Sequence, residues 1–278
     1  MTNRRGFTLI ELLVGMVLLS LVGVTMIKVI ATSQRVTTAQ SERVANQSNV
    51  RLGTFIVPTE LTQVNTTTST DILSMGASQI TYRAMRGYGF LCMAPTATTV
   101  SLYRDATYTG RQPILNRDSL LVFRENDPTL STDDQWVATG LVTNVQANGS
   151  CTGGINTLVF TTTGAPTGSN ITVGSPVRVF EVMQLGSYVA ADGKTYLGIR
   201  SVSAAEATLQ PVLGPLKAGG FNLAYEDASG TTTASTSAVR SIVMTIVGLT
   251  DQSVATSGNA RDRVVVQDSL QTRIALRN

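Results

Sequence analysis

The chain contains no histidine, only two cysteines and a single tryptophan. Without histidine, neither a Ser-His-Asp nor a Cys-His catalytic arrangement can form. Two isolated cysteines without histidine also cannot build a usual zinc site. The sequence has no Walker loop, no dinucleotide fingerprint and no H-E-x-x-H motif. We therefore expect no catalysis, no metal and no cofactor.

Charge is scarce as well. Charged residues make up 14% of the chain, and lysine occurs only at Lys28, Lys194 and Lys217. Such a composition is typical of an exported protein that hydroxyl groups rather than charges keep in solution. The formal net charge of +3 is too small to favour nucleic acid as a partner.

An almost uninterrupted apolar run extends from Phe7 to Ile27, with Glu11 as its one charged residue. About 20 residues at 1.5 Å rise each span a hydrocarbon core of about 30 Å. A carboxylate in such a helix costs about 2.5 to 3.5 kcal/mol at its centre and less near an end. Glu11 is therefore expected to have a function and a positive partner. A cut between Gly6 and Phe7 would supply that partner as the new α-amino group of Phe7.

The sequence G-F-T-L-I-E at residues 6–11, set between two arginines and this run, resembles the type III signal of the type IV pilin and pseudopilin family. The resemblance implies that a prepilin peptidase cuts after Gly6 and methylates the new N-terminal Phe7. Residues 1–6 are then the leader, and Glu11 is the fifth residue of the mature chain. The alternatives are a plain membrane anchor or a secretory signal, which usually has a shorter apolar region ending in small residues.

The resemblance also implies a role and a location. The chain would be a structural subunit that contacts other minor pilins and the major pilin through its N-terminal helix, together with the inner-membrane assembly platform and membrane lipid. Glu11 of one subunit would pair with the Phe7 amine of another. Arg4 and Arg5 would stay cytoplasmic and the C-terminal domain periplasmic, before the subunit moves into a pilus on the cell surface. Lys28 and Arg35, beyond the run, do not fit this charge rule.

Within the family, three features favour one branch. The spanning run lacks the proline that many major pilins carry, the remaining domain is large, and the chain ends in R-I-A-L-R-N at residues 273–278. These features look most like PilW-type minor pilins, which are thought to sit at the pilus tip and help prime assembly. A large J-type minor pseudopilin of a type II secretion system is the alternative.

A third reading is a tip adhesin or DNA-uptake subunit. It depends on a mild cluster of arginines and tyrosines, namely Arg83, Arg86, Arg104, Arg111, Tyr82, Tyr88, Tyr103 and Tyr108. Such a cluster can bind nucleic acid, although scattered arginines on strands are more often structural.

Residues 31–57 continue the helical pattern up to Pro58, with a loose apolar stripe at Val36, Ala39, Val44, Val50 and Leu52. Thr37-Thr38 and Gly53 are poor helix formers and leave the continuity of this helix open.

Ten β-rich runs follow, at 79–83, 99–103, 120–124, 136–145, 157–162, 177–183, 195–201, 221–225, 239–247 and 263–276. The expected fold class is α+β, with a long N-terminal transmembrane and spine helix followed by a β-rich globular domain, the pilin plan. We expect the transmembrane part at 7–30, its periplasmic continuation at 31–57, and the domain at 58–278, in one or two lobes.

Cys92 and Cys151 are expected to form a disulfide in an oxidising periplasm, the alternative being two unrelated buried thiols. Closing a loop of this size would stabilise the fold by about 4 kcal/mol. Asp127, Asp133 and Asp134 could form a calcium loop, but their spacing matches no EF-hand, so we expect a solvated turn.

Overall fold

The computed structural model of the protein describes residues 8–67, 71–104, 108–130, 133–151, 154, 156–168, 170–255 and 263–277. One helix, α1 (Leu9–Leu61), precedes all the strands. The strands of the described residues are β1 (Ile72–Met75), β2 (Gln79–Phe90), β3 (Thr99–Tyr103), β4 (Thr109–Gly110), β5 (Asp118–Arg124), β6 (Gln135–Ser150), β7 (Asn156–Thr162), β8 (Pro176–Val189), β9 (Thr195–Ser201), β10 (Gln210–Glu226), β11 (Ser241–Leu249), β12 (Val254–Ala255), β13 (Arg263–Val264) and β14 (Gln267–Ala275).

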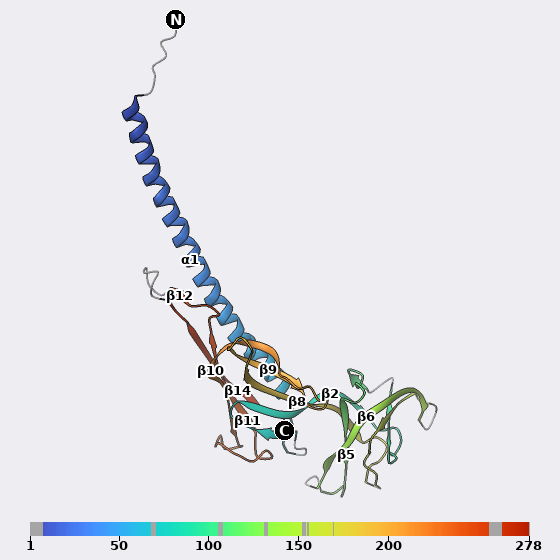
Figure 1. Ribbon diagram of the computed structural model, residues 1–278. Coiled ribbons are helices and arrows are strands. Elements are labelled where there is room, and N and C mark those ends of the chain that lie inside the picture. Colours follow the sequence, from blue (N-terminus) through green and yellow to red (C-terminus); the bar gives the residue numbers. More distant parts are fainter. Residues whose placement is uncertain are drawn as a thin grey trace.

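The predicted α+β class is confirmed: a long helix projects from a β-rich domain (Figure 1). One antiparallel sheet follows the order β14-β11-β10-β9-β8-β5-β6-β7-β3, and β2 pairs with β8, β1 and β4 beside this path. The strands β12 and β13 form a separate two-stranded sheet. Each β-rich run of the sequence lies at least partly on a strand, but β2, β8 and β10 are much longer than their patterns indicate.

The first half of α1 is exposed, and the second half packs against the β-rich domain. The buried residues of the helix are Asn46, Val50, Gly53, Val57 and Leu61. They recur every three or four positions and so form one stripe, which faces β10, β11 and β14. Of the stripe expected from the sequence, Val50 alone is buried, whereas Val36, Val44 and Leu52 are exposed.

Two glycines let the helix approach the sheet closely. A Cβ atom on Gly53 would lie 2.6 Å from Ile246 Cδ1 and 2.7 Å from Leu213 Cδ2. On the strand side, a Cβ atom on Gly248 would lie 2.6 Å from Val50 Cγ2. The weak helix propensity of Gly53 is therefore the cost of a close contact, and α1 remains unbroken through it.

The helix also passes through Pro58 and ends at Leu61, one turn beyond the end expected at Val57. A proline removes one hydrogen bond from the preceding turn. Val57 and Leu61 are both fully buried, and the Thr62 N–H donates to the Pro58 carbonyl at 2.9 Å. Packing on both sides of the proline therefore holds the last turn.

The buried apolar side chains of the domain form two clusters. The first lies beneath α1 and includes Tyr82 and Phe221, and the second lies among β3, β5, β6, β7 and β8 around Phe160. The long strand β8 contributes to both clusters, with Val179 in the second and Met183 in the first. Figure 1 shows β8 and β2 running from the helix side of the domain toward β5 and β6.

Candidate functional site: the exposed half of the helix

The N-terminal half of α1, Leu9–Ile30, carries the features that the sequence singled out; we call it the exposed half. Its large apolar side chains are all exposed, with exposed fractions between 52% for Val14 and 84% for Leu9. The best 18-residue window of α1 has a mean hydropathy of 2.4, and none of that window is buried. Among the described residues, α1 is the one helix long and apolar enough to cross a membrane. These properties are consistent with membrane anchoring.

The helix begins with a capping arrangement that the sequence reasoning missed. Thr8 is the N-cap residue, and its Oγ1 accepts a hydrogen bond of 3.3 Å from the Glu11 N–H. Thr8 and Glu11 have the T-x-x-E spacing of a capping box, which could have been read from the sequence. A carboxylate in the first turn also interacts favourably with the helix dipole. Glu11 therefore stabilises its own helix besides any role it has between subunits.

The hydroxyl side chains of Ser20 and Thr25 in the exposed half are satisfied within the helix. Ser20 Oγ donates to the Val17 carbonyl and Thr25 Oγ1 to the Val22 carbonyl, both at 2.8 Å. Hydroxyl groups bonded in this way are tolerated in lipid. The Glu11 carboxylate makes no ion pair with any other described residue. Gly6 and Phe7, the expected cleavage and methylation positions, lie outside the described residues.

Gly15 and Gly23 leave open space on the exposed half. A Cβ atom built on either residue would meet nothing within 4 Å. Small residues on a spanning helix permit close approach of another helix. The exposed half therefore offers an apolar surface with two shallow positions and one acidic group near its start.

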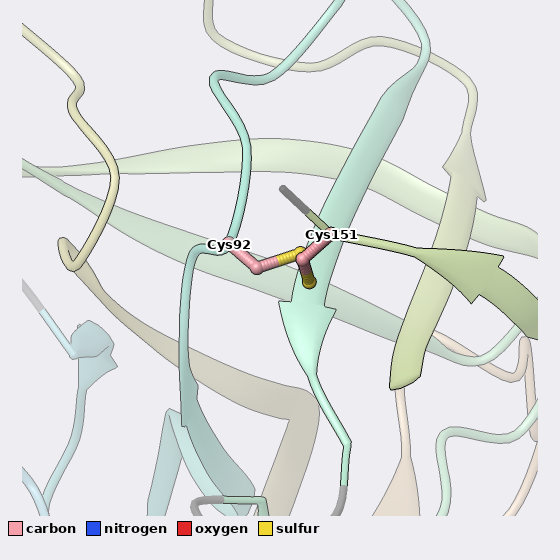
Figure 2. Close-up of a disulfide and its surroundings, with 2 residues drawn as sticks. All are labelled: Cys92 and Cys151. Carbon is pink, nitrogen blue, oxygen red and sulfur yellow. A yellow bond between two sulfur atoms is a disulfide. The ribbon is translucent and has the colours of Figure 1, made fainter. Parts of the chain in front are cut away.

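The predicted disulfide joins Cys92 and Cys151 in the structure (Figure 2). Cys92 follows β2 and Cys151 follows β6, and their Cα atoms lie 5.6 Å apart across a sequence separation of 59. Both residues are buried beside the second apolar cluster, since Leu91 belongs to that cluster. The disulfide thus links two strands of the part of the domain that is distant from the exposed half.

A group of charged side chains lies between the two apolar clusters. Glu181, on β8, is 1% exposed, and three arginines contact it: Arg86 at 3.1 Å, Arg111 at 3.2 Å, and Arg117. Burial by itself raises the pKa of the Glu181 carboxyl. Hydrogen bonds from Ser201, Arg117 and Arg86 outweigh this effect and hold the pKa below its ordinary value.

The same group ties the end of α1 to the sheet. Glu60, in the last turn of the helix, lies 3.3 Å from Arg86 Nη1 and accepts a 3.3 Å hydrogen bond from the Tyr82 hydroxyl. Burial, together with the Glu60 charge, raises the pKa of Tyr82 well above its ordinary value.

Several members of the arginine–tyrosine cluster considered for nucleic acid therefore have internal roles. Arg86 and Arg111 pair with carboxylates, including Asp118 at 2.5 Å from Arg111, and Tyr82 is fully buried. The Arg83 guanidinium lies 5.2 Å from the centre of the Phe180 ring. These side chains stabilise the domain, and they do not form an open basic surface.

The acidic turn after β5 has local hydrogen bonds. Asp127 Oδ1 accepts from the Thr129 hydroxyl at 2.7 Å and from the Thr129 N–H at 2.9 Å, and these bonds lower the pKa of Asp127. Within the described residues, no group of three or more carboxylate or cysteine side chains could hold a metal ion.

Comparison with known proteins gives one finding, at the N-terminus. Residues 1–27 match the family described as the prokaryotic N-terminal methylation motif. No curated protein and no solved structure matches the chain. The matched residues include the expected leader, the expected cleavage position and most of the exposed half. The chain therefore begins with a type IV pilin-like prepilin signal.

Proposed function

We propose that this protein is a minor type IV pilin, a membrane-anchored structural subunit that helps prime pilus assembly and sits at or near the pilus tip. One observation carries the proposal: the prepilin signal runs directly into an apolar helix half whose large apolar side chains are all exposed. An exposed apolar surface of this size requires lipid or other apolar helices around it. A subunit that moves from a membrane into a helical bundle is surrounded first by lipid and then by the apolar helices of other subunits.

Glu11 has the central part in the assembly step. Prepilin peptidase cuts after Gly6, and the methylated Phe7 then presents a cationic amine to the Glu11 carboxylate of a neighbouring subunit. In the low dielectric of the membrane, an unpaired carboxylate is costly and a paired one is much less so. The pair therefore fixes the axial position of the new subunit, while the apolar side chains from Leu12 to Ile27 supply the packing.

The absence of proline between Leu9 and Ile30 supports a minor rather than a major subunit, and the large β-rich domain agrees with a PilW-type position at the tip. A large J-type minor pseudopilin of a type II secretion system would have the same anchor and the same need for Glu11. Of the four arginines that might have favoured a DNA-uptake role, Arg86 and Arg111 are engaged by Glu60, Asp118 and Glu181.

An in-frame deletion in the native organism tests this function, scored together for surface pili and for secreted proteins. Loss of pili with normal secretion, restored by the wild-type chain on a plasmid, is the expected result. Lost secretion with normal pili would make the chain a pseudopilin. Normal pili and normal secretion would contradict both roles.

A further inference from the structure

A groove lies where the exposed half ends and the domain begins. The strands β12 and β13 form a short ribbon, and β12 contacts α1 (Figure 1). Between ribbon and helix is a groove of about 380 Å³, whose lining includes Gln34, Arg35 and Thr38 of α1 and Val254 and Arg263 of the ribbon. The groove therefore brings together two arginines that are far apart in the sequence.

The positive charge of this groove is not neutralised by the described residues around it. Arg35 forms no ion pair with any of them. Arg263 donates from Nε and Nη2 to the Ser253 carbonyl at 3.1 and 2.8 Å, and these bonds fix its guanidinium without cancelling its charge. The carboxylates nearby have other partners: Glu42 accepts from the Gln252 N–H at 3.2 Å, and Asp251 pairs with Lys194.

The position of the groove along the helix indicates its surroundings. The exposed half rises about 1.5 Å per residue and so covers a hydrocarbon core of about 30 Å from Leu9 to Ile30. The groove begins at Ala31, the next residue. The headgroup layer extends about 5 to 7.5 Å beyond the hydrocarbon, and Arg35 lies about 7.5 Å beyond Ile30 on the same rise. The two arginines are thus placed at the level of lipid phosphates.

We propose that this groove binds the phosphate of an anionic phospholipid in the leaflet that the domain faces. The proposal rests on the membrane anchoring that is part of the proposed function. Arg35 and Arg263 supply the charge and Gln34 supplies a neutral hydrogen-bond donor, whereas the Thr38 hydroxyl already donates to the Gln34 carbonyl at 3.0 Å. The half-exposed Val264 and Val265 next to Arg263 suit the boundary with the acyl chains. Binding of a lipid phosphate also explains why Arg35 lies on the side of the span where the positive-inside rule disfavours an arginine.

Lipid binding here would have a consequence for assembly. A subunit held by its span alone can tilt and rotate, whereas a second contact on the ribbon fixes how its domain rests on the membrane surface. The contact must be released when the subunit leaves the bilayer, so the groove would favour the membrane-bound state.

The test uses the full chain, purified in detergent, stripped of lipid and then supplied with phosphatidylglycerol, phosphatidylcholine or inorganic phosphate. Native mass spectrometry measures what remains bound. The variants are Arg35→Gln, Arg263→Gln and the double substitution. Arg51→Gln serves as the matched control, since Arg51 is an exposed arginine on the same helix, about 24 Å beyond Arg35.

We expect the wild type to retain phosphatidylglycerol in preference to phosphatidylcholine and not to retain inorganic phosphate. Each single substitution should reduce that preference about fivefold and the double substitution about 30-fold, while Arg51→Gln leaves it unchanged. Equal retention of both lipids by the wild type, or equal losses in the control and groove variants, would overturn the proposal.

Flotation of the same protein with vesicles separates this failure from failure of the anchor. Wild type and double variant should both float with bilayers, because the exposed half inserts in either case. A chain that floats without lipid selectivity retains its anchor and loses the groove proposal. A chain that does not float overturns both.

Discussion

The two halves of α1 have opposite relations between composition and burial. Leu9–Ile30 is almost wholly apolar and is exposed, whereas Ala31–Leu61 is largely polar and buries one face against β10, β11 and β14. In a protein surrounded by water throughout, the apolar half would be the buried one. The helix is therefore adapted to two solvents: its composition changes near Ile30, and its burial against the domain begins at Asn46.

The largest expected effect on assembly separates the two halves by function. Glu11→Ala should reduce incorporation into sheared pili by at least about tenfold, because loss of the intersubunit ion pair removes about 1.4 kcal/mol or more of assembly energy. Immunoblots of pilus and membrane fractions measure incorporation, and mass spectrometry of the N-terminus measures cleavage after Gly6.

Glu11→Gln provides the matched control, because glutamine can also occupy this position of a capping box. If the charge is what matters, both variants fail to incorporate while both are cleaved and remain in the membrane. Normal incorporation of either variant would contradict the assembly role of Glu11.

Removal of the disulfide should affect the domain and spare the exposed half. Replacing Cys92 and Cys151 together by alanine releases a loop closed across 59 positions and should lower the free energy of unfolding by about 4 kcal/mol. Urea unfolding of the full chain in detergent, followed by circular dichroism of the strands, measures this loss. Membrane insertion should be unchanged, and an unaltered urea midpoint would show that the bond contributes little.

Glu181→Gln should cost about 3 kcal/mol, because it leaves Arg86, Arg111 and Arg117 beside a neutral side chain. The pKa of Glu181 is lower in the folded protein than its ordinary value of 4.5, so its stabilisation is complete above that pH. It is lost as the pH falls through the lower folded value. Unfolding titrations should therefore show the full difference in free energy of unfolding between wild type and variant at neutral pH, and a much smaller difference at acidic pH. Glu125→Gln, at an exposed position, should follow the wild type at both.

The smallest effect compares two glycines of one helix. Gly53→Leu should destabilise the docked half by about 2 kcal/mol, since even a Cβ atom overlaps Ile246 and Leu213. Gly23→Leu places the same side chain in open space and should leave the unfolding of the domain unchanged. Thermal unfolding of both full chains measures the difference, and equal melting temperatures would mean that the helix does not need its close approach to the sheet.

The sequence predicted the α+β class, an N-terminal apolar helix and the bonding of Cys92 with Cys151, because each depends on a local signal or on the chemistry of a compartment. It left open whether the helix continues unbroken through Gly53. It did not predict the docking face of α1. Asn46 and Gly53 are not apolar residues, and their burial follows from the closely opposed Gly248 and Ile246, which lie about 200 residues later in the chain. Periodicity carries no information about such a partner.

The lengths of the strands were predicted wrongly for a related reason. The strand β10 begins at Gln210, but Pro211, Gly214, Pro215 and Gly219 conceal its first half from a pattern search. Pairing with β9 holds that half in place, from Gln210 opposite Ile199 to Leu216 opposite Thr195. The capping pair of Thr8 and Glu11, by contrast, is a local spacing that the sequence does contain.

Because α1 continues unbroken through Gly53 and Pro58, one rigid helix connects Glu11 to the β-rich domain. A straight helix turns about 100° per residue, so the direction in which Glu11 points about the helix axis fixes the rotational orientation of the domain about the same axis. If Glu11 selects its neighbour in a bundle, it also sets the direction in which the domain faces on the filament. A subunit seated one residue too high would present a domain rotated by about 100°. The axial position of the subunit and the rotation of its domain about the helix axis are then coupled. An error in axial position therefore changes which face of the domain is presented at the filament surface.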